Sequence, residues 1–172
     1  MMQSNKCNKL IIGITGPTGS GKSYICNLFE NLGAKIISAD KIGHEVLINE
    51  AKEQILKYFR TLERKEIGHI VFKDKEKLKK LNDIMHPLIV NKILNIIKDE
   101  SFVVIDAALL FEVGLHKYCT ETIYVLANKN ARLLRIIERD KITKLQAEAR
   151  IENEPSSIPN VNIVIYNDFE KN

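Results

Sequence analysis

The sequence predicts an α/β fold in which five parallel strands form one sheet flanked by helices. Three observations support this fold class. Short apolar runs alternate with amphipathic stretches, as in repeated β-α-β units. A glycine-rich loop joins the first apolar run to the first helical pattern. The interval 39–101 contains no convincing strand, so we expect a helical insert between the second and third strands.

The expected strands and the first helix follow from local patterns. The buried run 9–15 enters the glycine-rich loop, and the helix expected at 22–32 ends at Gly33. Its apolar residues fall on one face: Ile25, Leu28, Phe29 and Leu32. The remaining strands are expected at 35–38, 102–106, 122–126 and 161–165.

Within the insert, 44–60 and 74–98 are predicted to be amphipathic helices. Pro87 is expected either to kink the second of these helices or to start a new one. One face of this helix is expected to be apolar, with Leu78, Leu81, Ile84 and Met85.

Composition limits the class of protein. The 172 residues are 45% hydrophobic and 28% charged, which is typical of a single folded domain with a small insert. A net charge of +4 with 6% aromatic residues favours a small anionic ligand over nucleic acid. No apolar stretch approaches the ~20 residues of a membrane helix. The three cysteines lack metal or redox spacing. From these features together we expect a cytoplasmic protein that binds neither nucleic acid nor membrane.

The segment Gly16–Ser23 fits the phosphate-loop pattern G-x-x-x-x-G-K-[ST] in full. Its glycines allow backbone N–H groups to converge on phosphate oxygens, and the following helix presents its positive N-terminal end. Lys22 can reach the β- and γ-phosphates of a nucleoside triphosphate, and the Ser23 hydroxyl can ligate Mg²⁺. The predicted ATP-binding residues here are Gly16, Pro17, Thr18, Gly19, Ser20, Gly21, Lys22, Ser23 and Tyr24.

The class of nucleotide protein follows by exclusion. GTPases read guanine with N-K-x-D, but the segment 128–131 is Asn-Lys-Asn-Ala and lacks the aspartate. No transporter-type signature is present. The remaining class is the small kinases that phosphorylate a metabolite, with an insert that binds the acceptor and a lid that carries arginines.

Three further residues have two possible roles each. Asp40 follows the second strand, where a carboxylate could take the proton of an acceptor hydroxyl or only cap the next helix. Asp106 ends the third strand, where it could hold a Mg²⁺-bound water or only belong to a turn. His86 could contact the substrate or be purely structural.

A basic helix is expected near residue 130. Arg132, Arg135 and Arg139 have i, i+3, i+7 spacing and therefore project from one helical face. They could close over polyphosphate and neutralise its charge, or form an exposed basic face. The spacing of Thr143 and Gln146 predicts a capping box that starts a new helix carrying Arg150.

Seven segments spread over nearly the whole chain form a more specific pattern than the phosphate loop alone. They are, in order, GITGPTGSGKS, LGAKIISADKIGHEV, MHPLI, VVIDAALLFEVGL, RIIERDKIT, ARI and NIVIYND. In these segments the chain resembles the dephospho-CoA kinase family. The resemblance implies ATP-dependent phosphorylation of the ribose 3′-hydroxyl of dephospho-CoA, giving CoA and ADP, the final step of coenzyme A biosynthesis. It implies Mg²⁺ as cofactor and ATP and dephospho-CoA as binding partners; we expect a monomer or weak oligomer.

The resemblance also implies a division of the chain and a set of roles. The ranges 1–40 and 101–172 would form the nucleotide-binding core, 41–100 the helical insert that binds CoA, and about 128–155 the lid. Asp40 matches the catalytic base, which would act with Lys22 and Arg139. Arg135 and Arg139 match the lid pair that binds ATP, and Asn167 matches a position near adenine. The implied substrate-binding residues are Asp40, His86, Leu109, Leu110 and Glu112.

The sequence departs from the family pattern at several positions. Ser38 replaces the first aspartate of D-A-D, Ala108 replaces a proline, and Glu154 stands where glutamine is common. The segment 166–168 replaces D-N-x-G, and the sequence ends before a C-terminal helix that many members have. Two alternatives stay open: a kinase for another small metabolite, nucleoside or nucleotide, and a non-catalytic ATP- or CoA-binding relative.

Overall fold

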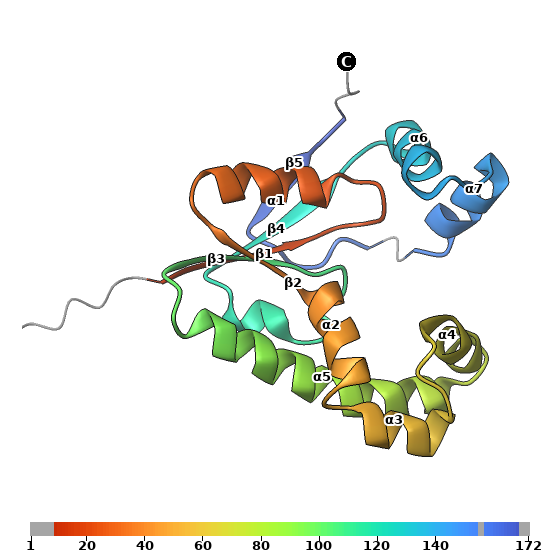
Figure 1. The fold of residues 1–172 in the computed structure, drawn as a ribbon. Coiled ribbons are helices and arrows are strands. Elements are labelled where there is room, and N and C mark those ends of the chain that lie inside the picture. Colours follow the sequence, from red (N-terminus) through yellow and green to blue (C-terminus); the bar gives the residue numbers. More distant parts are fainter. Residues whose placement is uncertain (1–8, 155–156, 169–172) are drawn as a thin grey trace, which may run out of the picture. The chain divides into compact units, whose positions relative to one another are not determined.

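The computed structural model describes residues 9–154 and 157–168 and consists of two compact units (Figure 1). The first unit comprises the described residues up to Ile37 and those from Glu100 onward. The second unit is Ser38–Asp99, which begins three residues before the insert expected at 41–100 and ends one residue earlier.

The first unit contains a five-stranded sheet in the order β2-β3-β1-β4-β5, so the predicted fold class is confirmed. β1 pairs in parallel with β3 and β4, and β4 pairs in parallel with β5. Because Ile14 lies opposite Asp106, the carboxyl ends of β1 and β3 meet at one edge of the sheet. The strands are β1 (Leu10–Thr15), β2 (Lys35–Ser38), β3 (Phe102–Asp106), β4 (Glu121–Leu126) and β5 (Ile163–Tyr166).

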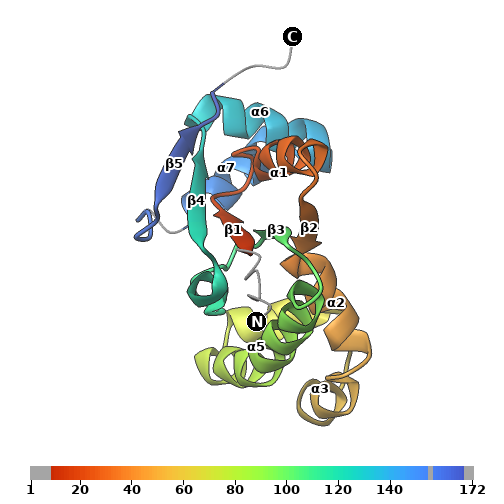
Figure 2. The same ribbon diagram turned by 90° about the vertical axis from the view of Figure 1, so that its left-hand side faces the viewer.

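Helix α1 (Lys22–Asn31) covers one face of this sheet (Figure 2). Ile25 and Cys26 are buried against strand residues such as Ile14 and Val104, and Phe29 packs at the edge of this core. The prediction that Leu28 and Leu32 share this buried face is wrong, since they are 44% and 73% exposed. Residues 25, 26 and 29 form the buried side of α1, and residue 28 lies beside it. Residue 32 follows the last helical residue.

The other face of β1 is packed closely at Gly13. A Cβ atom at this position would lie 2.7 Å from both Leu110 Cδ2 and Cys119 Sγ. The chain after β3, including the short 3₁₀ helix η1 (Leu115–Tyr118), can therefore contact the strand backbone directly.

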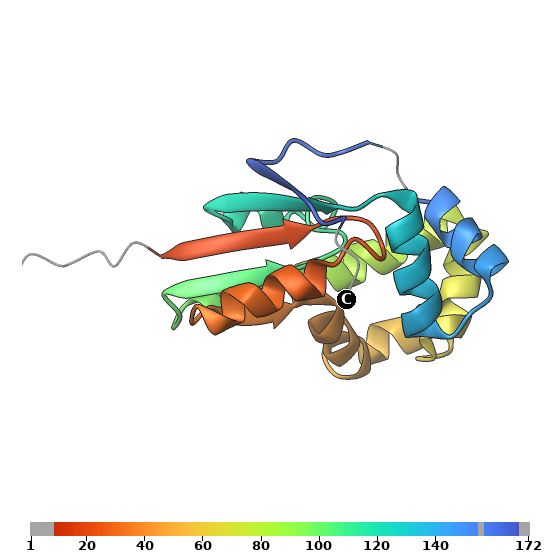
Figure 3. The ribbon, with the colours of Figure 1, turned by 90° about the horizontal axis from the view of Figure 1, so that it is seen from above.

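Two helices follow β4 and pack against each other: α6 (Lys129–Asp140) and α7 (Lys144–Glu152). Figure 3 shows α6 beyond the carboxyl ends of β1 and β4, beside the loop that follows β1. The predicted capping box is confirmed, because Gln146 N donates to Thr143 Oγ1 (3.3 Å) and Thr143 N donates to Gln146 Oε1 (3.0 Å).

The second unit is helical, as expected, but its helices differ from the prediction. They are α2 (Ala39–Ile48), α3 (Lys52–Phe59), α4 (Arg64–Phe72) and α5 (Lys75–Ile97). The segment predicted as one helix at 44–60 is broken at 49–51, and α4 was not predicted. Helix α4 has only nine residues, and Ile67 is its only buried residue, so it offers a short and weak signal for sequence reasoning.

Helix α5 is continuous through Pro87, which therefore does not start a new helix. Asp74 caps it by accepting hydrogen bonds from Glu76 N and Lys77 N, both 3.0 Å. Ile84 and Met85 are buried as expected, whereas Leu78 is 41% exposed. None of the helices among the described residues is both long and apolar enough to cross a bilayer.

Candidate active site

The phosphate loop has the backbone conformation that its glycines were expected to allow. Gly16, Gly19 and Gly21 have φ of 146°, 76° and 94°. A Cβ atom at Gly16 would lie 2.3 Å from Val125 O, so no other residue fits this position. Gly21 is the N-cap residue of α1, so the loop leads directly into the positive N-terminal end of this helix.

Lys22 lies folded back across the loop. Its Nζ donates hydrogen bonds to Gly16 O (2.7 Å) and Pro17 O (3.2 Å). The next two residues, Ser23 and Tyr24, are exposed in the first turn of α1. The ammonium group is therefore held at the loop, where a phosphate oxygen could replace a carbonyl oxygen as its partner.

Arg135 and Asn167 hold the outside of the loop. The Arg135 guanidinium donates to Gly19 O (3.2 Å), Ser20 O (3.3 Å) and Asn167 O (3.0 Å). Asn167 is buried, and its Nδ2 donates to Ser20 O at 3.0 Å. The structure thus brings together two residues that the resemblance assigned to ATP binding, and their observed contacts are with loop carbonyl groups.

Arg132 and Glu154 hold the Thr18 residue of the same loop. Thr18 N donates to Glu154 Oε1 (2.6 Å), and Arg132 Nε donates to Thr18 O (2.8 Å). The Arg132 guanidinium also forms an ion pair with Glu154 Oε2. Arg132 is therefore engaged with loop backbone and a carboxylate, so the alternative of an exposed basic face is wrong for this residue.

Arg139 lies at the far end of α6 and makes different contacts. It donates to both oxygens of Asp140 (2.7 and 3.0 Å), and Arg150 donates to Asp140 Oδ2 (2.5 Å). The hydrogen bond from Arg139 lowers the pKa of Asp140 below its ordinary value, with Arg150 acting in the same direction. The structure does not bring the Arg139 side chain to the phosphate loop.

Asp106 ends β3, next to the carboxyl end of β1. Burial raises the pKa of the nearby Cys26 thiol to about 12, and the charge of Asp106 contributes to this rise. Lys22 acts on the same thiol in the opposite direction, so both charged groups lie close to Cys26. Burial likewise raises the pKa of the Cys119 thiol to about 11, so both thiols carry little thiolate near neutral pH; Cys7 lies outside the described residues.

The segment 109–112, which the resemblance assigned to the substrate, forms a turn after β3. Leu109 is 55% exposed and Glu112 is also exposed, so both side chains are accessible. Leu110 is fully buried next to Gly13, so its side chain packs in the core of the unit. Phe111 stacks on His116 with ring centroids 4.5 Å apart.

Two candidate residues belong to the second unit. Asp40 is exposed and is the second residue of α2, and His86 is half-buried on α5. The alternative that Asp40 caps the helix is wrong, because Ser38 is the N-cap residue and its Oγ accepts from Lys41 N (3.4 Å). The carboxylate of Asp40 is therefore not used as the helix cap.

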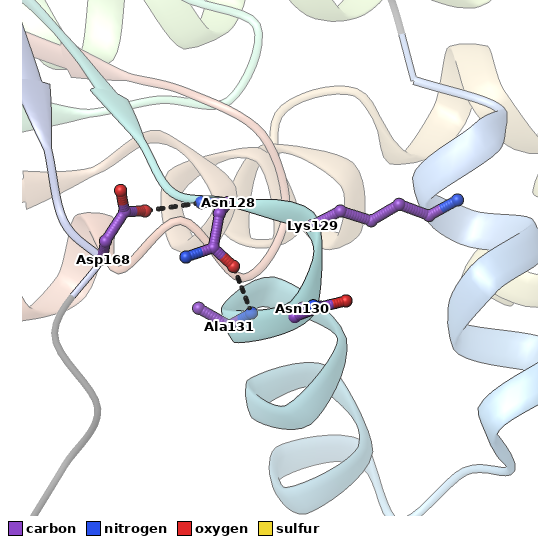
Figure 4. Close-up of a pocket in the computed structure, with 5 residues that line it drawn as sticks. All are labelled: Asn128, Lys129, Asn130, Ala131 and Asp168. Carbon is purple, nitrogen blue, oxygen red and sulfur yellow. Dashed lines mark hydrogen bonds between the residues drawn. The ribbon is translucent and has the colours of Figure 1, made fainter.

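An open pocket of about 320 Å³ lies at the start of α6 (Figure 4). It is lined by Asn128, Lys129, Asn130, Ala131 and Asp168. Asn128 N donates to Asp168 Oδ1 (2.6 Å), and Asn128 Oδ1 accepts from Ala131 N (2.8 Å). These bonds join the start of α6 to the chain after β5, directly beyond Asn167.

Sequence reasoning missed the contacts of Glu154 and Asp168 with the site. Glu154 was singled out only as a departure from the family pattern, and Asp168 only as part of an altered motif. The hydrogen bonds that these residues make join positions 136 and 40 residues apart in the chain. No local sequence signal could have paired them.

Comparisons with known proteins identify the family of this chain. The family model for dephospho-CoA kinase matches residues 10–169. The dephospho-CoA kinase of Fusobacterium nucleatum is 37% identical, over 92% of this chain and 89% of its own length. That of Borreliella burgdorferi is 36% identical, over 96% of this chain and 81% of its own length.

Solved structures show the same fold. TT1252 from Thermus thermophilus superposes with a TM-score of 0.82 at 26% identity, covering 94% of this chain and 90% of that one. A dephospho-CoA kinase from Campylobacter jejuni has a TM-score of 0.61 at 31% identity, covering 93% and 89%. The chain, with its phosphate loop and the side chains that surround it, belongs to the dephospho-CoA kinase family.

Proposed function

We propose that this chain transfers the γ-phosphoryl group of ATP to the ribose 3′-hydroxyl of dephospho-CoA, giving CoA and ADP. The observation that carries the proposal is a complete phosphate loop, with Lys22 held at it, in a chain whose family match runs over residues 10–169. This reaction is the final step of coenzyme A biosynthesis, and we place it in the cytoplasm.

ATP binds with its β- and γ-phosphates in the loop Gly16–Ser23. Lys22 exchanges the carbonyl oxygens of Gly16 and Pro17 for phosphate oxygens. The pocket at the start of α6 adjoins Asn167, so we assign it to the base or ribose of the nucleotide.

Magnesium is the cofactor that this chemistry requires. When bound with ATP, Mg²⁺ offsets negative charge on the β- and γ-phosphates. The donor set fits a metal held mainly by phosphate and water, because the described residues contain no group of three or more His, Cys, Asp and Glu side chains able to hold a metal ion. Ser23, exposed in the first turn of α1, and Asp106, at the end of β3, would be its protein contacts, the latter through water.

The transfer is an in-line displacement. The 3′-oxygen of the acceptor forms a bond to the γ-phosphorus, while the bond from that phosphorus to the β,γ-bridging oxygen breaks and ADP leaves. The Asp40 carboxylate accepts the proton of the 3′-hydroxyl. When the lid is closed, the Arg139 guanidinium leaves Asp140 and binds the phosphoryl group in transfer. Its positive charge then stabilises the negative charge of that group.

The contacts with the acceptor are assigned residue by residue. His86 on α5 and the exposed Leu109 and Glu112 are the residues that we assign to dephospho-CoA. Their roles rest on the family pattern and on the accessibility of Leu109 and Glu112.

Asp40→Asn provides the direct test of the assigned base. We expect kcat with dephospho-CoA to fall by about 10²- to 10⁴-fold, with the affinity for MgATP unchanged. The measurement is ADP release from MgATP with and without dephospho-CoA, together with identification of CoA as product. Ser38→Ala is the matched control: it removes the cap of α2 and should lower stability by about 1 kcal/mol while kcat is retained.

A panel of acceptors at equal concentration separates this reaction from other kinase activities. A preference for a nucleoside monophosphate over dephospho-CoA would contradict the proposal. An Asp40→Asn chain with wild-type kcat would show instead that the base is wrongly assigned while the reaction stands.

A further inference from the structure

Glu154 and Arg132 enclose one residue of the phosphate loop from two different segments of the chain. The carboxylate of Glu154, which follows α7, accepts the Thr18 N–H at 2.6 Å. Arg132, in the first turns of α6, donates from Nε to the Thr18 carbonyl at 2.8 Å. The ion pair between the two side chains closes a ring around the backbone of Thr18.

This ring is largely shielded from water. The side chains of Arg132 and Glu154 are 12% and 20% exposed, whereas those of the Lys144–Glu148 pair on α7 are 71% and 34% exposed. A charge-assisted hydrogen bond in such surroundings is stronger than one on the surface. Loss of either partner leaves the other as a poorly hydrated charge, while loss of both does not.

The ring also occupies one backbone N–H group of the phosphate loop. The Thr18 N–H is directed to Glu154, so it is not one of the loop N–H groups offered to phosphate in this arrangement. The negative charge of Glu154 close to a polyphosphate site is offset by Arg132. Neither side chain needs to touch the reacting atoms for the ring to determine the course of the loop.

We propose that Glu154 and Arg132 are a positioning pair for MgATP: together they fix the Thr18 end of the phosphate loop to both helices of the lid. The inference rests on the proposed function only in taking ATP as the nucleotide. The pair connects the position of α6 and α7 to the shape of the loop, because Arg132 belongs to α6 and Glu154 follows α7 by two residues.

The test is a double-mutant cycle with MgATP binding to the full chain measured by titration calorimetry. Glu154→Gln and Arg132→Gln should each weaken MgATP binding about tenfold, because each strands one buried charge. The double variant, which strands none, should bind within about threefold of wild type. Glu148→Gln on α7 is the matched control and should leave the affinity unchanged.

Three results would overturn the proposal. Tighter MgATP binding by Glu154→Gln would mean that the carboxylate competes with phosphate for the loop. Wild-type affinity in all three variants of the cycle would mean that the ring has no bearing on the nucleotide. If a single variant fails to fold, Glu154→Asp retains the charge but shortens the reach, and it should weaken MgATP binding; wild-type affinity of this variant also overturns the proposal.

The design separates this inference from the proposed function. The calorimetry measures MgATP binding in the absence of an acceptor. Turnover of dephospho-CoA by the wild-type chain is measured in a separate assay. A pair with only a structural role would lower the melting temperature without the predicted recovery of MgATP affinity in the double variant.

Discussion

The two ends of α6 carry arginines from the same helical face, yet they make different kinds of contact. At the beginning of the helix, Arg132 and Arg135 donate to backbone carbonyl groups of the phosphate loop. At the far end, Arg139 pairs with the neighbouring carboxylate of Asp140 and is 61% exposed. One regular spacing thus supports two kinds of contact: the first two arginines bond to the loop backbone, and the third bonds to a carboxylate.

The difference follows from what each arginine meets. The beginning of α6 packs on Gly19, where an added Cβ would lie 2.8 Å from Arg132 O, so the guanidinium groups of Arg132 and Arg135 can reach the loop carbonyl groups. No such backbone contact is made by Arg139, whose hydrogen bonds go to Asp140. Exposed ion pairs of this kind stabilise a fold little and are easily exchanged.

Among the variants that test this comparison, Gly21→Ala in the phosphate loop should lower activity most. The new Cβ would lie 2.0 Å from Asn167 Nδ2 and would displace Asn167 from Ser20, in addition to the strain at φ 94°. We expect kcat/KM to fall about a hundredfold, as for other ångström-scale displacements at an active site. Steady-state kinetics with MgATP as the varied substrate measure this change.

Gly33→Ala is the control for Gly21→Ala. Gly33 has nearly the same backbone conformation, φ 91°, but nothing within 4 Å of its added Cβ. It should therefore lose only about 1–2 kcal/mol of unfolding free energy from strain and retain kcat/KM. Equal losses of activity in the two variants would mean that the contact with Asn167 does not matter.

Arg135→Ala and Arg139→Ala compare the two ends of α6 directly. The first variant removes the donor to three carbonyl oxygens and should lower the unfolding free energy by about 2–3 kcal/mol. The second should change it by less than about 0.5 kcal/mol but reduce kcat about a hundredfold if Arg139 stabilises the transferred group. Urea unfolding and single-turnover kinetics give the two quantities. If both variants lost the same unfolding free energy and the same kcat, the two ends of α6 would not differ in role.

The smallest effect is expected at Asp140. Its pKa is held below the ordinary value of 3.8, mainly by the hydrogen bond from Arg139. A carboxyl group whose pKa is lower in the folded state stabilises the fold above that ordinary value, and this contribution is lost as the pH falls through the lowered pKa. Asp140→Asn should therefore cost less than about 0.5 kcal/mol near neutral pH, and the difference from wild type should vanish in acid. A difference that grows below about pH 4 would contradict the direction of this shift.

Much of the fold could be predicted because its signals are local. The buried strand 10–15, the phosphate loop and the helix after it are consecutive in the chain, and the capping box at Thr143 and Gln146 spans four residues. Where the signal weakened, the prediction failed: α4 has a single buried residue, and the run predicted at 44–60 is interrupted by a turn. The apolar pattern also could not show which residues of one helical face are buried: Leu28 was expected on the buried face and is exposed.

The sequence by itself determined the phosphate-loop motif and the conformation of its backbone, because all eight residues of the motif are adjacent and glycine alone adopts its left-handed positions readily. Only the tertiary structure decided how that loop is held. Glu154 reaches Thr18 across 136 residues, Arg135 reaches Ser20 across 115, and Leu110 is buried against Gly13. Such contacts depend on the register of the sheet and the packing of α6 and α7, which no short pattern encodes.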